Sequence, residues 1–435
     1  MTVAQKLETI VGSGGICCWE EIEASQKERI ARAIAPTTPP SCIVYPNSQA
    51  ELAEVIACAH RNNWRILPCG NGSKLSWGGL AVGVQVVVST ERLNQVIQHA
   101  VGDLTVTVEA GKKFAELQDT LATAKQFLAL DPTAPESATI GGIVATADTG
   151  SLRQRYNGVR DQLLGITFVR ADGQIAKAGG RVVKNVAGYD LMKLFTGSYG
   201  TLGIITQATF RIFPLPEVTG TVVLTGEAKA IAQAATTLRG SALTPTAADL
   251  LSAQLVKRLG IGQGLGLVTR FASMTESVKE QSNRLMEVGQ RLGLQGDLYS
   301  AGDESDLWQK LREQMGASTT EPVITCKIGM IPSAAVAILI QMDQATPQGV
   351  GLIHAGSGLG LLRWDCEQML ETVLNMRSLC QANGGFLTIL EAPIKLKQQL
   401  EVWGYTGNAL DIMRGIKQQF DPGNILSPGR FVDGI

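Results

Sequence analysis

Glycines gather in short segments that follow strand-like runs, and this arrangement constrains the fold more than any other feature. The chain has 48 glycines among its 435 residues, well above the average of roughly 7%. The first segment, residues 68–74 (PCGNGSK), comes directly after the strand-like run 64–67. Closely spaced glycines let successive backbone N–H groups turn toward one point, and such a concavity binds phosphate oxygens. The sequence therefore predicts either a phosphate-binding loop or an ordinary surface turn here.

A second segment, residues 137–146 (SATIGGIVAT), has the features of a helix start. Thr139 suits the N-cap position, and Gly141, Gly142 and Ala145 leave the backbone bare behind it. Amide donors and the helix dipole favour an anion at such a place, although close helix packing selects the same small residues. A third segment, residues 179–206, contains Gly200 and Gly203 around a turn into a strand, where backbone could face a flat ring.

Several other classes of protein are excluded by motif and composition. Residues 260–266 (GIGQGLG) precede a strand and lack the G-x-G-x-x-G spacing, and neither a P-loop nor a G-x-S-x-G motif occurs. A net charge of −1 argues against nucleic-acid binding. Eight scattered cysteines and three histidines predict no metal or iron–sulfur site in the chain. The apolar runs are too short to span a bilayer and the start lacks a signal-peptide pattern, so we expect a cytoplasmic protein, with docking on a membrane through a partner left open.

The pattern of strands and helices changes at Pro216. Short strands, glycine-rich turns and a few helices precede it, whereas strand-like and helix-like stretches alternate after it, as in an α+β unit whose sheet is covered on one face. We therefore expect an N-terminal helical segment at residues 1–38 and domains at 39–216 and 217–385. Residues 386–435 are expected to form a C-terminal segment that returns to the first domain.

Five segments together resemble the FAD-binding domain of the vanillyl-alcohol oxidase/p-cresol methylhydroxylase (PCMH) superfamily. They are residues 68–79 (PCGNGSKLSWGG), 131–146 (DPTAPESATIGGIVAT), 155–165 (RYNGVRDQLLG), 184–206 and 420–431 (FDPGNILSPGRF). The stretch VVKNVAGYDLMKLFTGSYGTLG is most similar to the FAD-binding E subunit of glycolate oxidase (glycolate dehydrogenase). The resemblance implies an α+β fold: a PCMH-type FAD-binding domain of two α+β subdomains, with a ferredoxin-like α+β cap domain. It also implies an FAD-dependent oxidoreductase that acts on CH–OH groups.

The resemblance implies a set of cofactor-binding residues. In the first loop the pyrophosphate lies against glycine and polar residues, a second phosphate loop follows, and the backbone of Ile205 meets the cofactor. The full set is Pro68, Cys69, Gly70, Asn71, Gly72, Ser73, Asp131, Pro132, Thr139, Gly141, Gly142, Ala145, Arg155, Tyr156, Arg160, Gly203 and Ile205. Relatives tether FAD through a His in the first loop or a Cys in the second. Both are missing here, so we expect non-covalent FAD and a structural role for Cys69.

The catalytic residues of related 2-hydroxy-acid dehydrogenases are only partly present. Those enzymes carry H-x-G-D-G-N-x-H, whereas this chain has HAGSGLGL from His354, with a single histidine and no later E-H-G. Tyr199 also replaces a glutamate of the relatives. A base must take the hydroxyl proton as hydride leaves for the flavin. His354 and Arg363 are the candidate catalytic residues, and the histidine that would orient His354 in the relatives is absent.

The missing histidines favour a flavin-holding subunit of a glycolate oxidase complex. Substrate oxidation would then occur mainly on a homologous FAD-binding partner of the D type, and an iron–sulfur subunit of the F type would take the electrons onward. One alternative is a self-sufficient dehydrogenase for a small 2-hydroxy acid of the D-lactate kind, with Lys327, Arg363 and His354 as its anion site. A second alternative is a non-catalytic scaffold for assembly.

Overall fold

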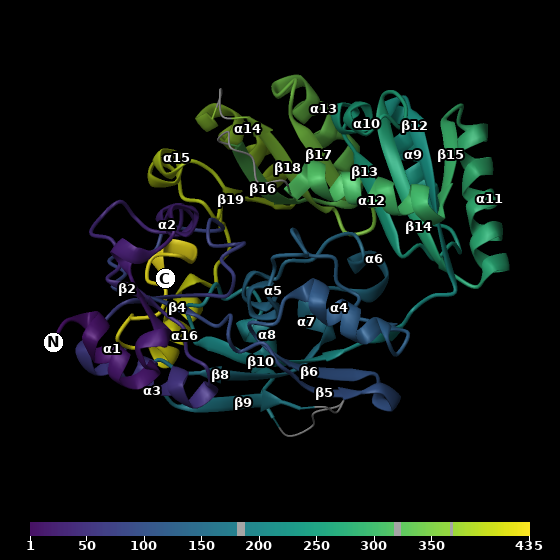
Figure 1. The fold of residues 1–435 in the computed structure, drawn as a ribbon. Helices are drawn as coiled ribbons and strands as arrows, with labels where there is room; N and C mark the ends of the chain where they lie inside the picture. The colour runs from purple at the N-terminus through teal and green to yellow at the C-terminus, as the bar shows by residue number, and fades with distance from the viewer. Residues whose placement is uncertain (181–187, 317–322, 366–368) are drawn as a thin grey trace. The chain divides into compact units, whose positions relative to one another are not determined.

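The computed structural model describes residues 1–180, 188–316, 323–365 and 369–435 (Figure 1). It divides into two compact units. The first unit comprises Met1–Thr149, Gly158–Leu215 and Lys397–Ile435, and the second comprises Gly150–Asn157 and Pro216–Leu396. Residues 181–187 of the third glycine-rich segment, and Cys366, lie outside the described residues.

The first sheet of the first unit has four strands in the order β1-β2-β4-β3. They are β1 (Ile16–Cys18), β2 (Cys42–Val44), β3 (Ile66–Cys69) and β4 (Val86–Ser89). Strands β2, β3 and β4 are parallel, and helix α3 (Gln49–Asn62) connects β2 to β3. Because parallel strands end at the same edge, the segments after β3 and β4 emerge side by side. Strand β1 pairs with β2, so the expected N-terminal helical segment, which holds α1 (Val3–Val11) and α2 (Ala24–Ala31), also contributes a strand to this sheet.

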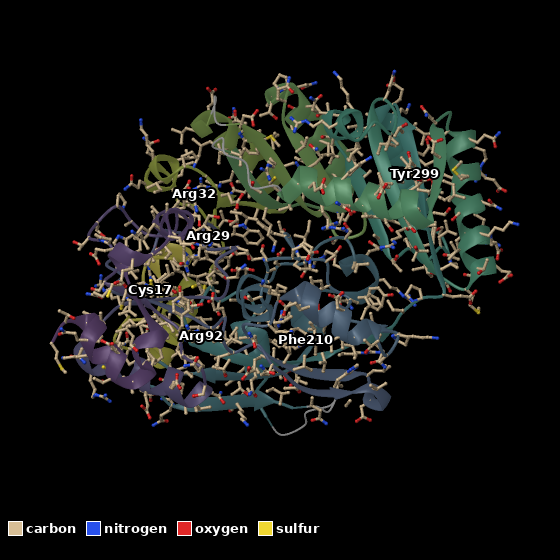
Figure 2. The ribbon with its side chains drawn as sticks, viewed as in Figure 1. Cys17, Arg29, Arg32, Arg92, Phe210 and Tyr299 are labelled. Carbon is tan, nitrogen blue, oxygen red and sulfur yellow. The ribbon has the colours of Figure 1, made fainter. Side chains whose placement is uncertain are left out.

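The second sheet of the first unit is antiparallel, with the order β5-β6-β10-β8-β9 (Figure 1). Its strands are β5 (Val96–Ala100), β6 (Thr105–Glu109), β8 (Leu163–Val169), β9 (Ile175–Gly179) and β10 (Ile204–Arg211). Strands β8 and β9 form a hairpin. Phe210, labelled in Figure 2, is fully buried in the core with Phe168 and Phe195.

Short elements complete the first unit. They are α4 (Phe114–Ala122), α5 (Ile140–Thr146), α7 (Val159–Gln162), α8 (Leu191–Phe195), α16 (Leu410–Phe420) and the two-strand pair β7 (Gln126–Phe127) and β11 (Phe213–Pro214). Helix α15 (Ile394–Gln399) crosses the boundary at Leu396. The two sheets agree with the expected pair of α+β subdomains.

The second unit contains two ferredoxin-like halves in one eight-stranded antiparallel sheet. The first half is β12 (Val218–Gly226), α9 (Ala228–Arg239), β13 (Ala247–Leu251), β14 (Leu265–Ser273), α11 (Thr275–Arg291) and β15 (Gln295–Ser300). The second half is β16 (Val323–Gly329), α13 (Ala335–Ala345), β17 (Val350–His354), β18 (Leu359–Asp365), α14 (Met369–Ala382) and β19 (Phe386–Glu391). The strand order β15-β12-β14-β13-β17-β18-β16-β19 is the β-α-β-β-α-β topology twice over. The cap is therefore ferredoxin-like, as expected, but double.

One feature of this unit differs from the expectation. Strand β19 pairs with β16, so residues 386–391 belong to the second unit's sheet and not to the returning C-terminal segment. The cause is long-range pairing, and Leu387, Ile389 and Leu390 are buried in this edge position. Helices α10 (Ala253–Leu259) and α12 (Ala301–Gly316) pack together, and Trp308 of α12 joins their apolar cluster. A further helix, α6 (Arg153–Tyr156), contacts β13. None of the described helices is both long and apolar enough to cross a bilayer.

Candidate functional site

A cavity opens in the first unit, at the carboxyl edge of its parallel strands. The wall comes from the segments after β3 and β4, the start of α5, the turn before β10 and the C-terminal tail. The lining residues are Pro68, Cys69, Gly70, Gly72, Ser73, Lys74, Leu75, Thr90, Thr139, Gly141, Gly142, Ala145, Thr146, Tyr199, Gly200, Gly203, Ile204, Ile205 and Arg430.

The loop after β3 presents unused amide donors. The backbone N–H groups of Asn71, Gly72, Ser73 and Lys74 have no hydrogen-bond acceptor within the part of the chain that the structure describes. Gly72 has a φ of +77°, a left-handed conformation that glycine adopts without strain. Consecutive free donors on a loop of this kind bind anionic oxygens.

Arg29 of α2 lies beside this loop. Its Nε is 3.9 Å from the position that a Cβ on Gly72 would take. The side chain is exposed and has no partner among the described residues. Figure 2 labels it together with Arg32 of the same helix region, whose guanidinium is paired with Glu28 at 2.5 Å. Arg29 therefore adds an unpaired positive charge beside the free amides.

The start of α5 approaches the same loop closely. A Cβ on Gly70 would lie 2.1 Å from Oγ1 of Thr139, so only glycine fits there. Thr139 is the N-cap, as expected, and its Oγ1 accepts from the N–H of Gly142 at 3.4 Å. The N–H groups of Ile140 and Gly141 donate to the carbonyls of Lys112 and Ala110, at 2.9 and 2.7 Å. The first amides of α5 are thus already bonded, and α5 contributes a close-packed wall.

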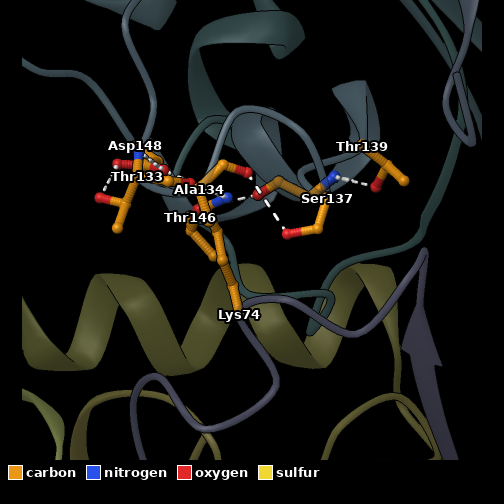
Figure 3. A network of polar contacts seen from close by, with 8 residues as sticks. Lys74, Thr133, Ala134, Ser137, Thr139, Thr146 and Asp148 are labelled. Carbon is orange, nitrogen blue, oxygen red and sulfur yellow. Dashed lines mark hydrogen bonds and ion pairs between the residues drawn. The ribbon is translucent and has the colours of Figure 1, made fainter. Parts of the chain in front are cut away.

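A buried ion pair holds the two loops together (Figure 3). Nζ of Lys74 lies 3.2 Å from Oδ2 of Asp148, and both side chains are almost fully buried. The same carboxylate accepts from the backbone N–H of Thr133 at 2.9 Å, while Lys74 also donates to the Thr133 carbonyl at 3.3 Å. Asn71 donates from Nδ2 to the carbonyl of Ser137 at 3.2 Å. The polar network therefore fixes the shape of the cavity floor.

The turn before β10 closes another side of the cavity. Tyr199 has a φ of +53°, an uncommon conformation for a residue with a side chain, and its ring lies edge-on to Trp403 at 4.7 Å. Burial raises the pKa of its hydroxyl, so Tyr199 is neutral at physiological pH. Gly200 follows with a φ of +75°, and a Cβ there would lie 2.6 Å from Cγ of Pro68. Burial likewise raises the pKa of the Cys69 thiol to about 12, which keeps this lining thiol protonated.

Part of the predicted cofactor set lies away from this cavity. Asn71 faces Ser137 through its side chain, and Asp131, Pro132 and Arg160 do not line the wall. Arg155 and Tyr156 belong to α6 in the second unit. The residues that the cofactor prediction missed are Lys74, Leu75, Thr90, Thr146, Tyr199, Gly200, Ile204 and Arg430. All of them except Thr90 lie within the quoted segments, where Lys74 is the charged residue of the first loop and Arg430 is the positively charged residue of the tail motif.

His354 has an orienting partner that the sequence did not reveal. Its Nδ1 lies 2.6 Å from Oδ1 of Asp249, and both side chains are buried. The two residues are direct cross-strand partners on β17 and β13, 105 residues apart in sequence. Oδ2 of Asp249 is buried without a hydrogen-bond partner. The expectation that His354 stands alone is therefore wrong, because a carboxylate takes the orienting role.

Arg363, the second catalytic candidate, lies apart from this pair. It is opposite Val350 on β17, and His354 is four residues further along that strand, a distance of about 13 Å. Its guanidinium donates to the carbonyl of Met315 at 3.3 Å, and burial lowers its pKa. The structure does not bring His354 and Arg363 together.

Across the described residues no group of three or more His, Cys, Asp or Glu side chains could hold a metal ion.

Comparisons with known proteins agree with this fold. Residues 40–179 match the family model described as FAD binding domain. The glycolate oxidase subunit GlcD of Bacillus subtilis is 26% identical over 419 residues, covering 90% of this chain and 88% of that protein. The D-lactate dehydrogenase of Archaeoglobus fulgidus is 27% identical over 410 residues, covering 90% and 91%. A solved structure of p-cresol methylhydroxylase with substrate bound aligns with a TM-score of 0.78 at 17% identity, covering 98% of this chain and 96% of that one.

The cofactor is FAD, and the cavity suits it. Gly72, Ser73 and Lys74 line the cavity and have free amides that can receive a pyrophosphate, and the glycines at positions 70 and 200 let the wall segments approach Thr139 and Pro68 closely. The fold is that of PCMH-type FAD-binding proteins.

Proposed function

We propose that this FAD-dependent oxidoreductase takes part in the oxidation of a small 2-hydroxy acid, glycolate, to the corresponding oxo acid, glyoxylate. The observation that carries the proposal is the match of about nine-tenths of the chain to proteins named for glycolate and D-lactate oxidation. A match of this extent includes the second unit as well as the FAD-binding domain. The class of substrate, a small 2-hydroxy acid, is therefore inferred from the similarity of both units to these proteins.

The residues of the first unit have a binding role in this proposal. Bound FAD supplies the hydride acceptor for the substrate carbon. The free amides of residues 72–74 would hold the pyrophosphate, and the Lys74–Asp148 pair fixes the loop that carries them. Tyr199, Gly200 and Ile205 form another part of the cavity wall. Substrate binding is assigned to none of these groups.

His354 is the proposed acid–base residue of the second unit. When Nδ1 donates to Asp249, the lone pair on Nε2 is free to accept the proton of a hydroxyl group. Asp249 then stabilises the imidazolium that forms, as the buried aspartate does in a Ser-His-Asp triad. Asp249 acts as a positioning residue, because its carboxylate bonds to the ring of the histidine.

We propose that the chain works as the E-type FAD-binding subunit of a glycolate oxidase complex. The partners are a homologous D-type subunit, which carries the main substrate site, and an F-type iron–sulfur subunit. Support comes from Leu359 and Leu361, which stand where the related dehydrogenases carry polar residues. The second candidate is a self-sufficient 2-hydroxy-acid dehydrogenase, and the His354–Asp249 pair favours it.

Anaerobic addition of glycolate, or D-lactate, to the purified holoprotein separates the two candidates. Flavin absorbance is followed with the chain alone and after addition of the partner subunits. Bleaching of the chain alone supports the self-sufficient enzyme. Bleaching only with partners supports the complex subunit, and a flavin that no 2-hydroxy acid bleaches under either condition contradicts the proposed function.

A further inference from the structure

Arg430 brings a buried positive charge to the cavity wall of the first unit. Its side chain comes from the C-terminal tail, is 4% exposed and lines the cavity. The guanidinium donates to the carbonyls of Trp77 at 2.7 Å, Leu75 at 3.0 Å and Ala33 at 3.5 Å. All three acceptors are neutral, and among the described residues no carboxylate lies within ion-pair distance of Arg430.

The absence of a counter-ion sets Arg430 apart from the buried cations Lys74 and Lys417. Lys74, also on the wall, is paired with Asp148, and Lys417 lies 2.6 Å from Asp421. Burying a charge without a partner of opposite sign is costly. Burial lowers the pKa of Arg430 to about 10, so the group still carries its charge at neutral pH. A cavity with this wall favours an anionic ligand group.

We propose that Arg430 is a cofactor-binding residue whose guanidinium supplies the positive charge for an anionic part of bound FAD. The inference rests on the FAD cavity and is independent of the substrate. FAD offers two sources of negative charge: the pyrophosphate, which is always charged, and the isoalloxazine ring, which gains charge on two-electron reduction. Carbonyl hydrogen bonds hold the guanidinium in place before the ligand arrives, which preorganises the site.

A purely structural role for Arg430 can be tested against a matched residue. Lys397 is also almost fully buried, and it donates to the carbonyls of Ser76 and, at 2.9 Å, of Gly78. The two cations thus bind alternate carbonyls of the same segment, residues 75–78. Lys397 does not line the cavity. A substitution at Lys397 therefore removes a comparable clamp on the segment without removing charge from the cavity.

The experiment compares Arg430→Gln, Arg430→Lys and Lys397→Gln in the full chain. The flavin is removed, the apoprotein is titrated with FAD, and the midpoint potential of the reconstituted protein is measured. We expect Arg430→Gln to lose at least tenfold in FAD affinity, or in preference for the reduced over the oxidised cofactor. Tenfold in that preference equals about 30 mV for a two-electron couple. Arg430→Lys and Lys397→Gln should stay within threefold of the unsubstituted chain in both measurements.

Two results would overturn the proposal. One is an Arg430→Gln variant that matches the unsubstituted chain in affinity and potential, and the other is an equal loss in Lys397→Gln. If the glutamine variant does not fold, Arg430→Lys decides, because a tenfold loss there means that guanidinium shape and not charge is required.

Two simpler ligands separate the sources of charge. Adenosine diphosphate carries the pyrophosphate without the ring, and riboflavin carries the ring without phosphate. A weaker affinity of Arg430→Gln for adenosine diphosphate assigns the charge to the pyrophosphate. A lowered midpoint potential with unchanged binding of adenosine diphosphate assigns it to the reduced ring.

Discussion

Replacing Gly70 by alanine tests the contact between the two loops of the FAD cavity. The new Cβ would lie 2.1 Å from Oγ1 and 2.9 Å from Cβ and Cγ2 of Thr139. Ordinary contacts are about 3.5 Å, so the loops must separate by roughly 1 Å. Overpacking of this kind costs about 1–3 kcal/mol. If FAD has to restore the original spacing, its affinity falls by about 5- to 150-fold, at 1.4 kcal/mol per tenfold.

The assay is titration of the apoprotein with FAD, followed by flavin fluorescence, with the melting temperature measured on the same samples. Gly102→Ala is the matched control, since a Cβ there meets nothing within 4 Å and the backbone is not left-handed. Thr139→Ala removes Oγ1 and Cγ2, so we expect the double substitution of Gly70 and Thr139 to bind FAD better than the two single effects predict. A folded Gly70→Ala protein with a dissociation constant within twofold of the unsubstituted chain would refute the reasoning.

Three further predictions follow from the cofactor loop and from the second unit. Arg29→Ala should weaken FAD binding several-fold at low salt and little at high salt, because salt screens an exposed charge. Arg32→Ala breaks only an exposed pair with Glu28 and should leave FAD affinity unchanged. Equal effects of the two substitutions on FAD affinity would contradict a role for Arg29. Because burial raises the pKa of Cys69 to about 12, its thiol should resist iodoacetamide at pH 8 in the folded apoprotein and react faster as the pH rises toward 12. Peptide mass spectrometry measures the alkylation, and rapid alkylation of Cys69 at pH 8 would argue against this burial. Asp249→Asn should slow flavin reduction at least tenfold and shift its pH profile without changing FAD affinity; a rate and profile like those of the unsubstituted chain would remove the His354–Asp249 pair from the mechanism.

Local patterns predicted the elements that depend on neighbours in sequence. The glycine-rich loop after β3 and the N-cap Thr139 followed from short-range rules, because turns and caps are fixed by a few consecutive residues. Those features also located most of the cavity wall.

Long-range pairings could not be predicted in this way. Strand β19 finds its place beside β16 only in the assembled sheet, and its apolar run alone does not specify that neighbour. Asp249 becomes the partner of His354 through the β13–β17 pairing, across 105 residues. Arg430 reaches Leu75 across 355 residues. A single sequence holds no signal for such contacts, because residue type limits which partners are suitable but not which one is close.

The junction of the two ferredoxin-like halves has a consequence for the solubility of fragments. The halves meet where β13 pairs with β17 through only three residue pairs, Asp249↔His354, Leu250↔Ile353 and Leu251↔Leu352. If the chain were cut between α12 and β16, each half would present one of these strands as a bare edge with unpaired backbone groups. Such an edge is a template for association with other chains. Pairing of β13 with β17 therefore covers two strand edges that could otherwise associate with other chains. The same strand pairing contains the His354–Asp249 pair.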